Sequence, residues 1–185
     1  MSTLDIVGIC GSLRSGSINR MALNLAAESL PMEVVEFRDV PLFNADVLAA
    51  GAPPVVTALN ERLRRADGIV IATPEYNFSI PGVLKNLIDW ISRDKQQAFS
   101  QKPVAILSAS PGPLGGPRVQ YDLRKVLLFV NAMTLVKPEV FIGSAPTKFD
   151  AAGRCTDDPT RQFVAAQMQA FEKWIAGVAR MNAAA

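Results

Sequence analysis

Short runs of consecutive apolar residues recur along this chain, and they limit the folds that it can adopt. Each run has the length of a β-strand and shows no alternation of apolar and polar side chains. Strands of this kind are buried on both faces, which is typical of a parallel sheet with helices packed on both sides. Five runs are predicted as strands: residues 4–10, 33–37, 68–73, 103–108 and a run within 134–142.

Amphipathic patterns separate the apolar runs, with apolar residues recurring every three or four positions as on the buried face of a helix. Asp158 and Pro159 predict the N-cap and the first position of the last helix. The residues before it, 143–159, are predicted to form a surface loop. The five apolar faces include Ile18, Met21 and Leu25; Val56, Leu59 and Leu63; Leu84, Leu87, Ile88 and Ile91; Val119, Leu123, Val126, Leu127 and Val130; and Val164, Met168, Phe171, Ile175 and Val178.

Five strands that alternate strictly with five helices predict an α/β fold, and the length of the chain fits a single domain over residues 1–185. Among doubly wound folds, five strands favour the flavodoxin-like three-layer α/β/α sandwich, with a five-stranded parallel sheet in the order 2-1-3-4-5. In this fold a ligand binds beyond the carboxyl ends of the strands, where the strand order reverses. The loops after strands one, three and four are therefore the candidate site.

The chain contains no histidine and only two cysteines, Cys10 in an apolar run and Cys155 in a polar loop. This composition excludes Ser-His-Asp and Cys-His catalysis, His-ligated metals and a disulfide framework, and we predict no metal site. The net charge of +2, without a run of Lys or Arg, argues against binding to nucleic acid or to a membrane surface. No signal-peptide pattern or membrane-spanning stretch is found, so we expect a cytoplasmic protein.

The loop after the first strand, residues 11–19, combines two glycines, three serines, an arginine and an asparagine at the start of a helix. Backbone N–H groups and the helix dipole favour an anion there, and Ser12, Arg14, Ser17 and Asn19 can add hydrogen bonds. A Walker A loop would need lysine in place of Ser17, and the G-x-G-x-x-G fingerprint is absent. The loop predicts a socket for one phosphate monoester, with an ordinary capped turn as the alternative.

The loops after the third and fourth strands also have unusual compositions. Residues 73–82 contain two prolines that stiffen the loop, and Tyr76 and Phe78 place aromatic surface beside the expected cleft. Residues 108–116 contain three glycines, which allow a ligand to approach the backbone closely. Either loop alone fits ordinary packing, but three such loops at one edge of a sheet predict a site for a flat heterocycle.

The sequence Gly-Ser-Leu-Arg-Ser-Gly-Ser-Ile-Asn after strand one, with Pro-Glu-Tyr-Asn after strand three, resembles the NADPH-dependent FMN reductase family. The resemblance is closest to its bacterial quinone, chromate and azo-dye reductases. It implies that FMN is the cofactor and that NADPH or NADH is the hydride donor. The residues that it assigns to FMN are Ser12, Arg14, Ser17, Ile18 and Asn19 at the phosphate, Pro74, Glu75, Tyr76 and Asn77 along the ring and ribityl chain, and Ala109, Ser110 and Gly112 at the other edge of the ring.

The resemblance also implies a ping-pong reaction, in which hydride passes from NAD(P)H through FMN to a quinone or another oxidised acceptor, such as chromate, an azo compound or free flavin. No catalytic side chain is expected, because the flavin carries the chemistry. Tyr76 and Asn77 are expected to shape the substrate pocket, and Glu75 to act mainly through its backbone. Arg93 is either a solvated cation at a helix end or a contact to an acceptor in a neighbouring subunit's site.

Apolar residues outside the core faces predict a homodimer or homotetramer. Trp90, Leu128 and Phe129 fall outside the stripes of the third and fourth helices, and a partner subunit would cover them. Arg118, Tyr121 and Glu139 are then assigned to the cleft or to contacts between dimers.

Two other classes of protein share the same predicted fold. A flavodoxin would carry single electrons between partners, but such proteins tend to be strongly acidic, unlike this chain. A flavin-free receiver module needs clustered carboxylates after the first strand, where residues 10–12 provide none.

Overall fold

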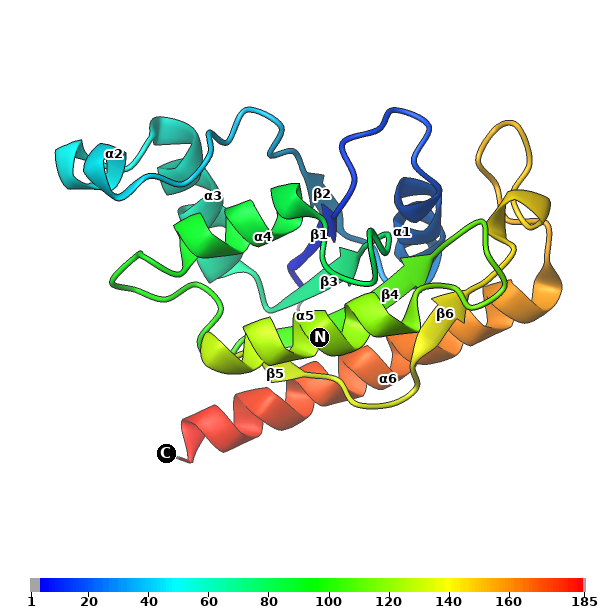
Figure 1. Ribbon diagram of the computed structural model, residues 1–185. Helices are drawn as coiled ribbons and strands as arrows, with labels where there is room; N and C mark the ends of the chain where they lie inside the picture. Colours follow the sequence, from blue (N-terminus) through cyan, green and yellow to red (C-terminus); the bar gives the residue numbers. More distant parts are fainter. Residues whose placement is uncertain (1–3, 185) are drawn as a thin grey trace.

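The computed structural model describes residues 4–184, which form one parallel sheet between two layers of helices. The order along the sheet is β2-β1-β3-β4-β5, and β6 also pairs with β4. Every pairing between these strands is parallel, so their carboxyl ends meet at one edge (Figure 1). The predicted order is confirmed. The strands are β1 Ile6–Cys10, β2 Glu33–Val35, β3 Gly68–Ala72, β4 Pro103–Ala109, β5 Met133–Thr134 and β6 Val140–Ile142.

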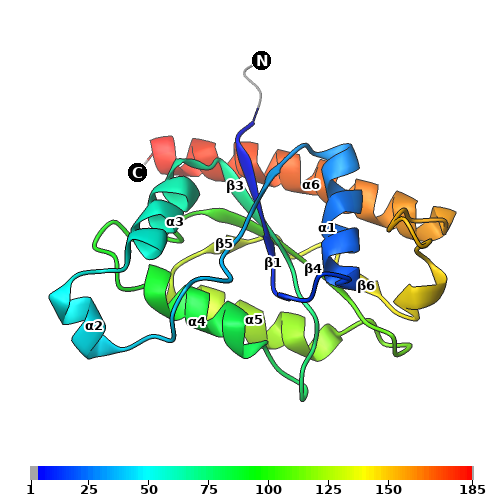
Figure 2. The ribbon, with the colours of Figure 1, turned by 90° about the horizontal axis from the view of Figure 1, so that it is seen from above.

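Two apolar clusters hold the layers together, one on each face of the sheet. Helices α1 (Ile18–Ser29) and α6 (Asp158–Ala183) pack on one face. On the other face lie α3 (Pro54–Arg65), α4 (Gly82–Ile91) and α5 (Pro117–Phe129), as seen from above in Figure 2. No helix among the described residues is long and apolar enough to cross a membrane.

The fifth strand position holds two short segments rather than one strand. Val104 pairs with Thr134 and Leu107 pairs with Val140, so the ladder is interrupted between them. Gln167 of α6 donates to the carbonyl oxygens of Ile106 and Pro138, at 3.0 Å each. This buried side-chain amide replaces backbone pairing at the gap. The apolar run in the sequence carries no sign of the interruption, because the substitute donor lies on a distant helix.

A further short helix, α2 (Ala45–Ala50), follows β2 and was absent from the predicted elements. None of its residues is buried, so it shows no apolar stripe that a pattern search would detect. The segment just before α2 covers Trp90, which is 1% exposed, donates to the Pro41 carbonyl at 2.8 Å and meets the Phe43 ring edge-on. The prediction that Trp90 needs a partner subunit to cover it is therefore wrong.

The last helix begins one residue earlier than the sequence pattern suggests. Its N-cap is Asp157, not Asp158, and the Asp157 carboxylate accepts from the Thr160 amide at 3.0 Å. Asp157 has the correct spacing because an N-cap side chain reaches the amide three residues later. Hydrogen bonds from Thr160, with a weaker contribution from the Lys148 ammonium 3.7 Å away, hold the pKa of Asp157 below its ordinary value.

We predict that Asp157→Ala lowers the urea midpoint at neutral pH, and that Asp157→Asn lowers it less because asparagine keeps an oxygen acceptor for the cap. Since the pKa of Asp157 is lower in the folded chain than in the unfolded one, the ionised group stabilises the fold above the unfolded value of about 3.9. That stabilisation is lost as the pH falls through the folded pKa. Urea titrations at several pH values measure the effect. If the difference in urea midpoint between the parent and Asp157→Asn does not become smaller in acid, this account is contradicted.

Candidate functional site

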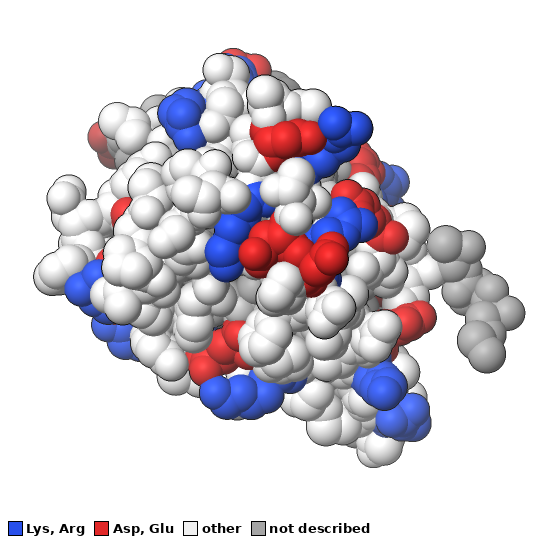
Figure 3. Space-filling model, turned by 90° about the vertical axis from the view of Figure 1, so that its right-hand side faces the viewer, with Lys and Arg blue, Asp and Glu red and all other residues white. Residues whose placement is uncertain are grey.

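A cleft of about 620 Å³ opens at the carboxyl ends of the strands, on the side of the molecule shown in Figure 3. Acidic and basic side chains lie next to one another near the middle of this face, and uncharged side chains cover most of the rest. The cleft brings together eight of the twelve predicted cofactor residues: Ser12, Arg14, Ser17, Ile18, Asn19, Pro74, Tyr76 and Ala109.

The loop between β1 and α1 presents an anion socket to the cleft. Ser17 is the N-cap of α1, and its hydroxyl accepts from the Arg20 amide at 3.4 Å. The amides of Ile18 and Asn19 occupy the first helical positions, where a helix offers no backbone acceptor. These N–H groups and the positive end of the helix dipole can therefore bind an oxyanion.

Arg14 is the cationic side chain of this socket. It is exposed, and one guanidinium nitrogen lies 3.6 Å from the position that a Cβ on Gly16 would take. Within residues 4–184, no hydrogen bond or ion pair engages its guanidinium. The group remains available for a phosphate, with which it can form charge-assisted hydrogen bonds.

Asn19 lies at the cleft, but its side chain is already occupied. The carboxamide donates to the Ala109 carbonyl and accepts from the Ala109 amide, both at 2.9 Å, and the residue is 3% exposed. This pair of bonds joins the start of α1 to the end of β4. Asn19 therefore fixes the distance between two walls of the cleft.

Close backbone packing joins the first and second loops. A Cβ on Gly11 would lie 2.5 Å from the Thr73 hydroxyl oxygen, so only glycine fits there without movement. Cys10, buried directly below, donates a thiol hydrogen bond to the Ser12 carbonyl at 3.5 Å. Its position matches the predicted buried, small apolar residue.

In the loop after β3, residues 73–81, successive side chains point to different places. Pro74 is buried against the cleft, and Tyr76, 52% exposed, lines its rim. The Glu75 carboxylate instead accepts from Arg118 Nε at 2.8 Å and from the Val119 amide at 3.2 Å, at the start of α5. Asn77 is exposed and lies outside the lining.

Ala109, the last residue of β4, and Pro111, in the loop of residues 110–116 that follows, line the cleft. Ser110 and Gly112 are not part of the lining, and the Ser110 hydroxyl donates to the Gly112 carbonyl at 3.1 Å. Backbone bonds from the Ser110 amide to Ile142, and from the Ala145 amide to Ser110, attach this loop to the segment after β6.

The segment after β6 forms a fourth wall that sequence patterns did not reveal. Residues 143–159 were predicted to be an unremarkable surface loop, yet Ala145, Pro146, Phe149 and Asp150 line the cleft. Cys155, predicted in a polar loop, is 6% exposed. The signal that could have identified this wall is positional, since the segment follows a strand at the same edge of the sheet.

Asp150 holds this fourth wall in shape. Its carboxylate accepts from the amides of Ala152 and Arg154 and from Arg154 Nε, each at 2.9 Å. These hydrogen bonds, chiefly the one from the Arg154 backbone, hold the pKa of Asp150 below its ordinary value.

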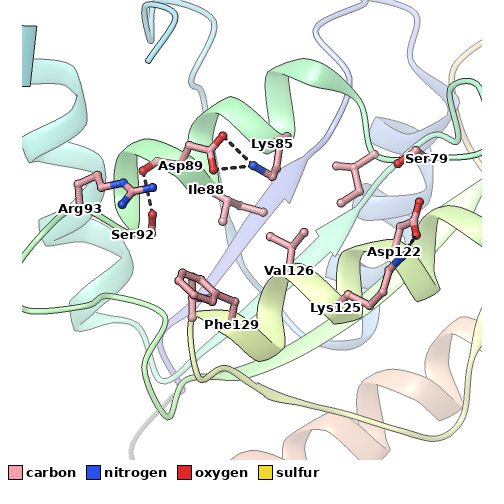
Figure 4. A pocket seen from close by; sticks show the side chains of 12 residues that line it. Ser79, Lys85, Ile88, Asp89, Ser92, Arg93, Asp122, Lys125, Val126 and Phe129 are labelled. Atoms are coloured by element: carbon pink, nitrogen blue, oxygen red, sulfur yellow. Dashed lines mark hydrogen bonds and ion pairs between the residues drawn. The ribbon is translucent and has the colours of Figure 1, made fainter. Parts of the chain in front are cut away.

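Arg93 lies outside the cleft of its own chain. It borders a second cavity of about 550 Å³ between α4 and α5, where Phe129 also lies (Figure 4). Its guanidinium carbon is 5.4 Å from the centre of the Phe43 ring. Arg93 therefore does not line the cleft of its own chain, and a contact between Arg93 and a neighbouring subunit's site stays a prediction.

Tyr121 and Glu139 lie together at the edge formed by α5 and β6. Lys137 Nζ is 2.5 Å from the Glu139 carboxylate. Its hydrogen bond, with a further one from Tyr121, holds the pKa of Glu139 below its ordinary value. Neither residue lines the main cleft.

Comparisons with known proteins agree with this geometry. The family model for NADPH-dependent FMN reductase matches residues 4–147. An NAD(P)H-dependent FMN reductase of Pseudomonas aeruginosa is 48% identical over 176 residues, which cover 93% of this chain and 95% of the relative. A quinone reductase of Escherichia coli is 44% identical over 179 residues, with the same coverage.

Among solved structures, the flavoenzyme NAD(P)H:(acceptor) oxidoreductase of Paracoccus denitrificans superimposes with a TM-score of 0.87 and 33% identity. The match covers 94% of this chain and 98% of the other. The flavodoxin-like fold is thereby confirmed. With a family model that spans most of the chain and curated relatives of nearly the same length, the chain belongs to the NADPH-dependent FMN reductase family.

Proposed function

We propose that this protein is an NAD(P)H-dependent oxidoreductase that binds FMN in the cleft and reduces quinones, with chromate, azo compounds and free flavin as further acceptors. The observation that carries the proposal is the Arg14 guanidinium, uncommitted among the described residues, beside the free amides at the start of α1. Family membership supports it, as do the names of the relatives. A cytoplasmic location, where nicotinamide nucleotides are available, fits this role.

The cleft has the size and chemistry that FMN requires. Its volume of about 620 Å³ lies within the usual range for small-molecule sites. Ser12, Arg14 and Ser17, with the Ile18 and Asn19 amides, would hold the phosphate. Pro74, Tyr76 and Ala109 would contact the ring, and Glu75, Asn77, Ser110 and Gly112 would contribute through the backbone of their loops.

FMN bound in the cleft would supply the redox chemistry, by which one hydride from NAD(P)H is carried to the acceptor and water supplies the remaining proton. The protein's own residues bind and orient the reactants. No side-chain acid or base is needed, which agrees with the absence of histidine from the sequence. Tyr76, half-exposed at the rim, would border the space in which donor and acceptor alternate.

We also propose that two chains associate through α4 and α5. Leu128 is 78% exposed and Phe129 is 84% exposed, beside the cavity that holds Arg93. A two-fold interface across this face would bury both side chains and bring each Arg93 close to the other subunit. Tyr121 on α5 and Glu139 just before β6 lie outside this interface and would be placed where two dimers could meet, whereas Arg118 is already engaged by Glu75 and Phe78 of its own chain.

To test the function, we would saturate the purified protein with FMN and mix it rapidly with NADH or NADPH, then with a quinone. We expect about one FMN per chain, bleaching of the flavin absorbance by the nucleotide and its recovery with the quinone. Binding of FAD in preference to FMN, or no reduction by either nucleotide, contradicts the proposal. In the same assay, Arg14→Ala is expected to weaken FMN binding about 10- to 150-fold, the effect of losing a charge-assisted hydrogen bond.

A matched control for Arg14→Ala is Arg180→Ala, which removes an exposed arginine from the last turn of α6, away from the cleft. It should bind FMN like the parent. Quenching of flavin fluorescence measures the affinity of each variant, and equal affinities for Arg14→Ala and the parent would show that Arg14 does not bind the phosphate.

For the assembly, we predict that Phe129→Asp dissociates the dimer, because it places a charge in an apolar interface. Light scattering should give the parent two or four times the chain mass of 19.9 kDa and the variant a lower mass. Met181→Asp, which changes an exposed apolar residue at the end of α6, is the control and should leave the mass unchanged. A monomeric parent at micromolar concentration would exclude this interface.

A further inference from the structure

The loop after β3 ends in a tight two-residue turn whose backbone is unfavourable for its sequence. The Tyr76 amide donates to the Ser79 carbonyl at 3.1 Å, and the Ser79 amide donates to the Tyr76 carbonyl at 3.0 Å. The two central residues both have positive φ, 50° for Asn77 and 65° for Phe78. Turns of this type favour Asn followed by Gly. A bulky residue such as Phe78 is rare in the left-handed region and persists only where its surroundings enforce it.

The surroundings that enforce this turn come from the first turns of α5. The Arg118 guanidinium carbon lies 3.8 Å from the centre of the Phe78 ring. Arg118 Nε also donates to the Glu75 carboxylate, whose other oxygen accepts from the Val119 amide. The Glu75 side chain is only 9% exposed, so this ion pair is shielded on the carboxylate side.

A third contact holds the far end of the turn. Figure 4 shows Ser79 facing Asp122, one turn further along α5. The Lys125 ammonium, 2.5 Å from the Asp122 carboxylate, and to a smaller extent Ser79 hold the pKa of Asp122 below its ordinary value. Helix α5 therefore contacts the turn before, within and after its two strained residues, and Arg118 takes part in the first two of these contacts.

Tyr76 connects the turn to the cleft. Its amide and carbonyl close the turn, and its side chain lines the cleft rim. The backbone geometry of the turn therefore sets the direction in which the Tyr76 side chain leaves the chain. If Phe78 relaxed to a negative φ, the paired hydrogen bonds would break and Tyr76 would move.

We propose that Arg118 is a positioning residue that holds the Tyr76–Ser79 turn in its left-handed conformation and thereby sets the affinity for the oxidised acceptor. It acts through Phe78 and Glu75 and does not touch FMN or the acceptor. The claim that Arg118 sets the affinity for the acceptor, the acceptor half of this inference, rests on the proposed function. The claim that Arg118 holds the turn does not.

The turn can be examined without any flavin, by hydrogen exchange of the Tyr76 and Ser79 amides in the full chain. Arg118→Ala should speed exchange of both amides about 5- to 30-fold, the factor expected from losing 1–2 kcal/mol of local stability. Arg118→Lys keeps the charge near Glu75 but loses the planar contact with Phe78, and should give a smaller increase. The control Arg180→Ala should change neither amide. Unchanged exchange in Arg118→Ala would overturn the inference.

A double-mutant cycle separates positioning from direct contact. Phe78→Gly removes the unfavourable side chain, and glycine adopts a positive φ readily. In the FMN-loaded parent, Arg118→Ala should raise the KM for a small quinone about 5- to 30-fold, with a smaller change in kcat and in FMN affinity. In the Phe78→Gly background, the same substitution should raise KM much less. An equal rise in both backgrounds would mean that Arg118 touches the acceptor itself, and would overturn the positioning role.

The two measurements also keep this inference apart from the proposed function. Failure of the parent to reduce quinones would overturn the function and the acceptor half together, while the exchange rates would still decide the role of Arg118 in the turn. Faster exchange in Arg118→Ala with an unchanged KM would overturn the acceptor half alone.

Discussion

The site depends on one buried carboxamide. Asn19 both donates to and accepts from the backbone of Ala109, a residue 90 positions away. The two bonds are shielded from water, and loss of either partner would leave a buried polar group unsatisfied at a cost of about 1–3 kcal/mol. They fix the start of α1, where an anion can bind, against the end of β4, where the wall of the cleft begins. The close approach of Gly11 to Thr73 joins the loops after β1 and β3 in the same part of the molecule.

Most of the fold could be predicted from local patterns. Uniform apolar runs locate the strands, because a strand buried on both faces has apolar residues at every position. Apolar residues at every third or fourth position locate the core helices, because each helix buries one stripe. The elements that were not predicted show no such apolar pattern in their own residues. Helix α2 has no buried face, and the gap in the fifth strand is bridged by Gln167 from a helix about 30 to 60 residues further along the chain. The burial of Trp90 likewise depends on Pro41 and Phe43, which precede it by more than 45 residues.

The composition of the site was predictable, but the direction of its side chains was not. The composition of the first loop predicts a phosphate socket, and Ser12, Arg14 and Ser17 do line the cleft together. Glu75 and Ser110 occupy the expected loops, yet the Glu75 carboxylate accepts from Arg118 and Val119 at the start of α5, and the Ser110 hydroxyl donates to the Gly112 carbonyl. The wall formed by Pro146, Phe149 and Asp150 was missed because its residue types are ordinary, and only the packing of the whole chain brings it to the cleft.

The interruption at the fifth strand position also bears on how the chain avoids unwanted association. The sheet ends in a two-residue and a three-residue strand on one side and in the three-residue strand β2 on the other. An open sheet border is a template on which another chain can add a strand, and long flat borders favour aggregation. Within residues 4–184, neither border has a strand longer than three residues, and side chains already bond to the Met133 and Leu135 carbonyls at one of them. The sheet is therefore a poor nucleus for strand addition, so its two borders protect the chain from edge-to-edge aggregation.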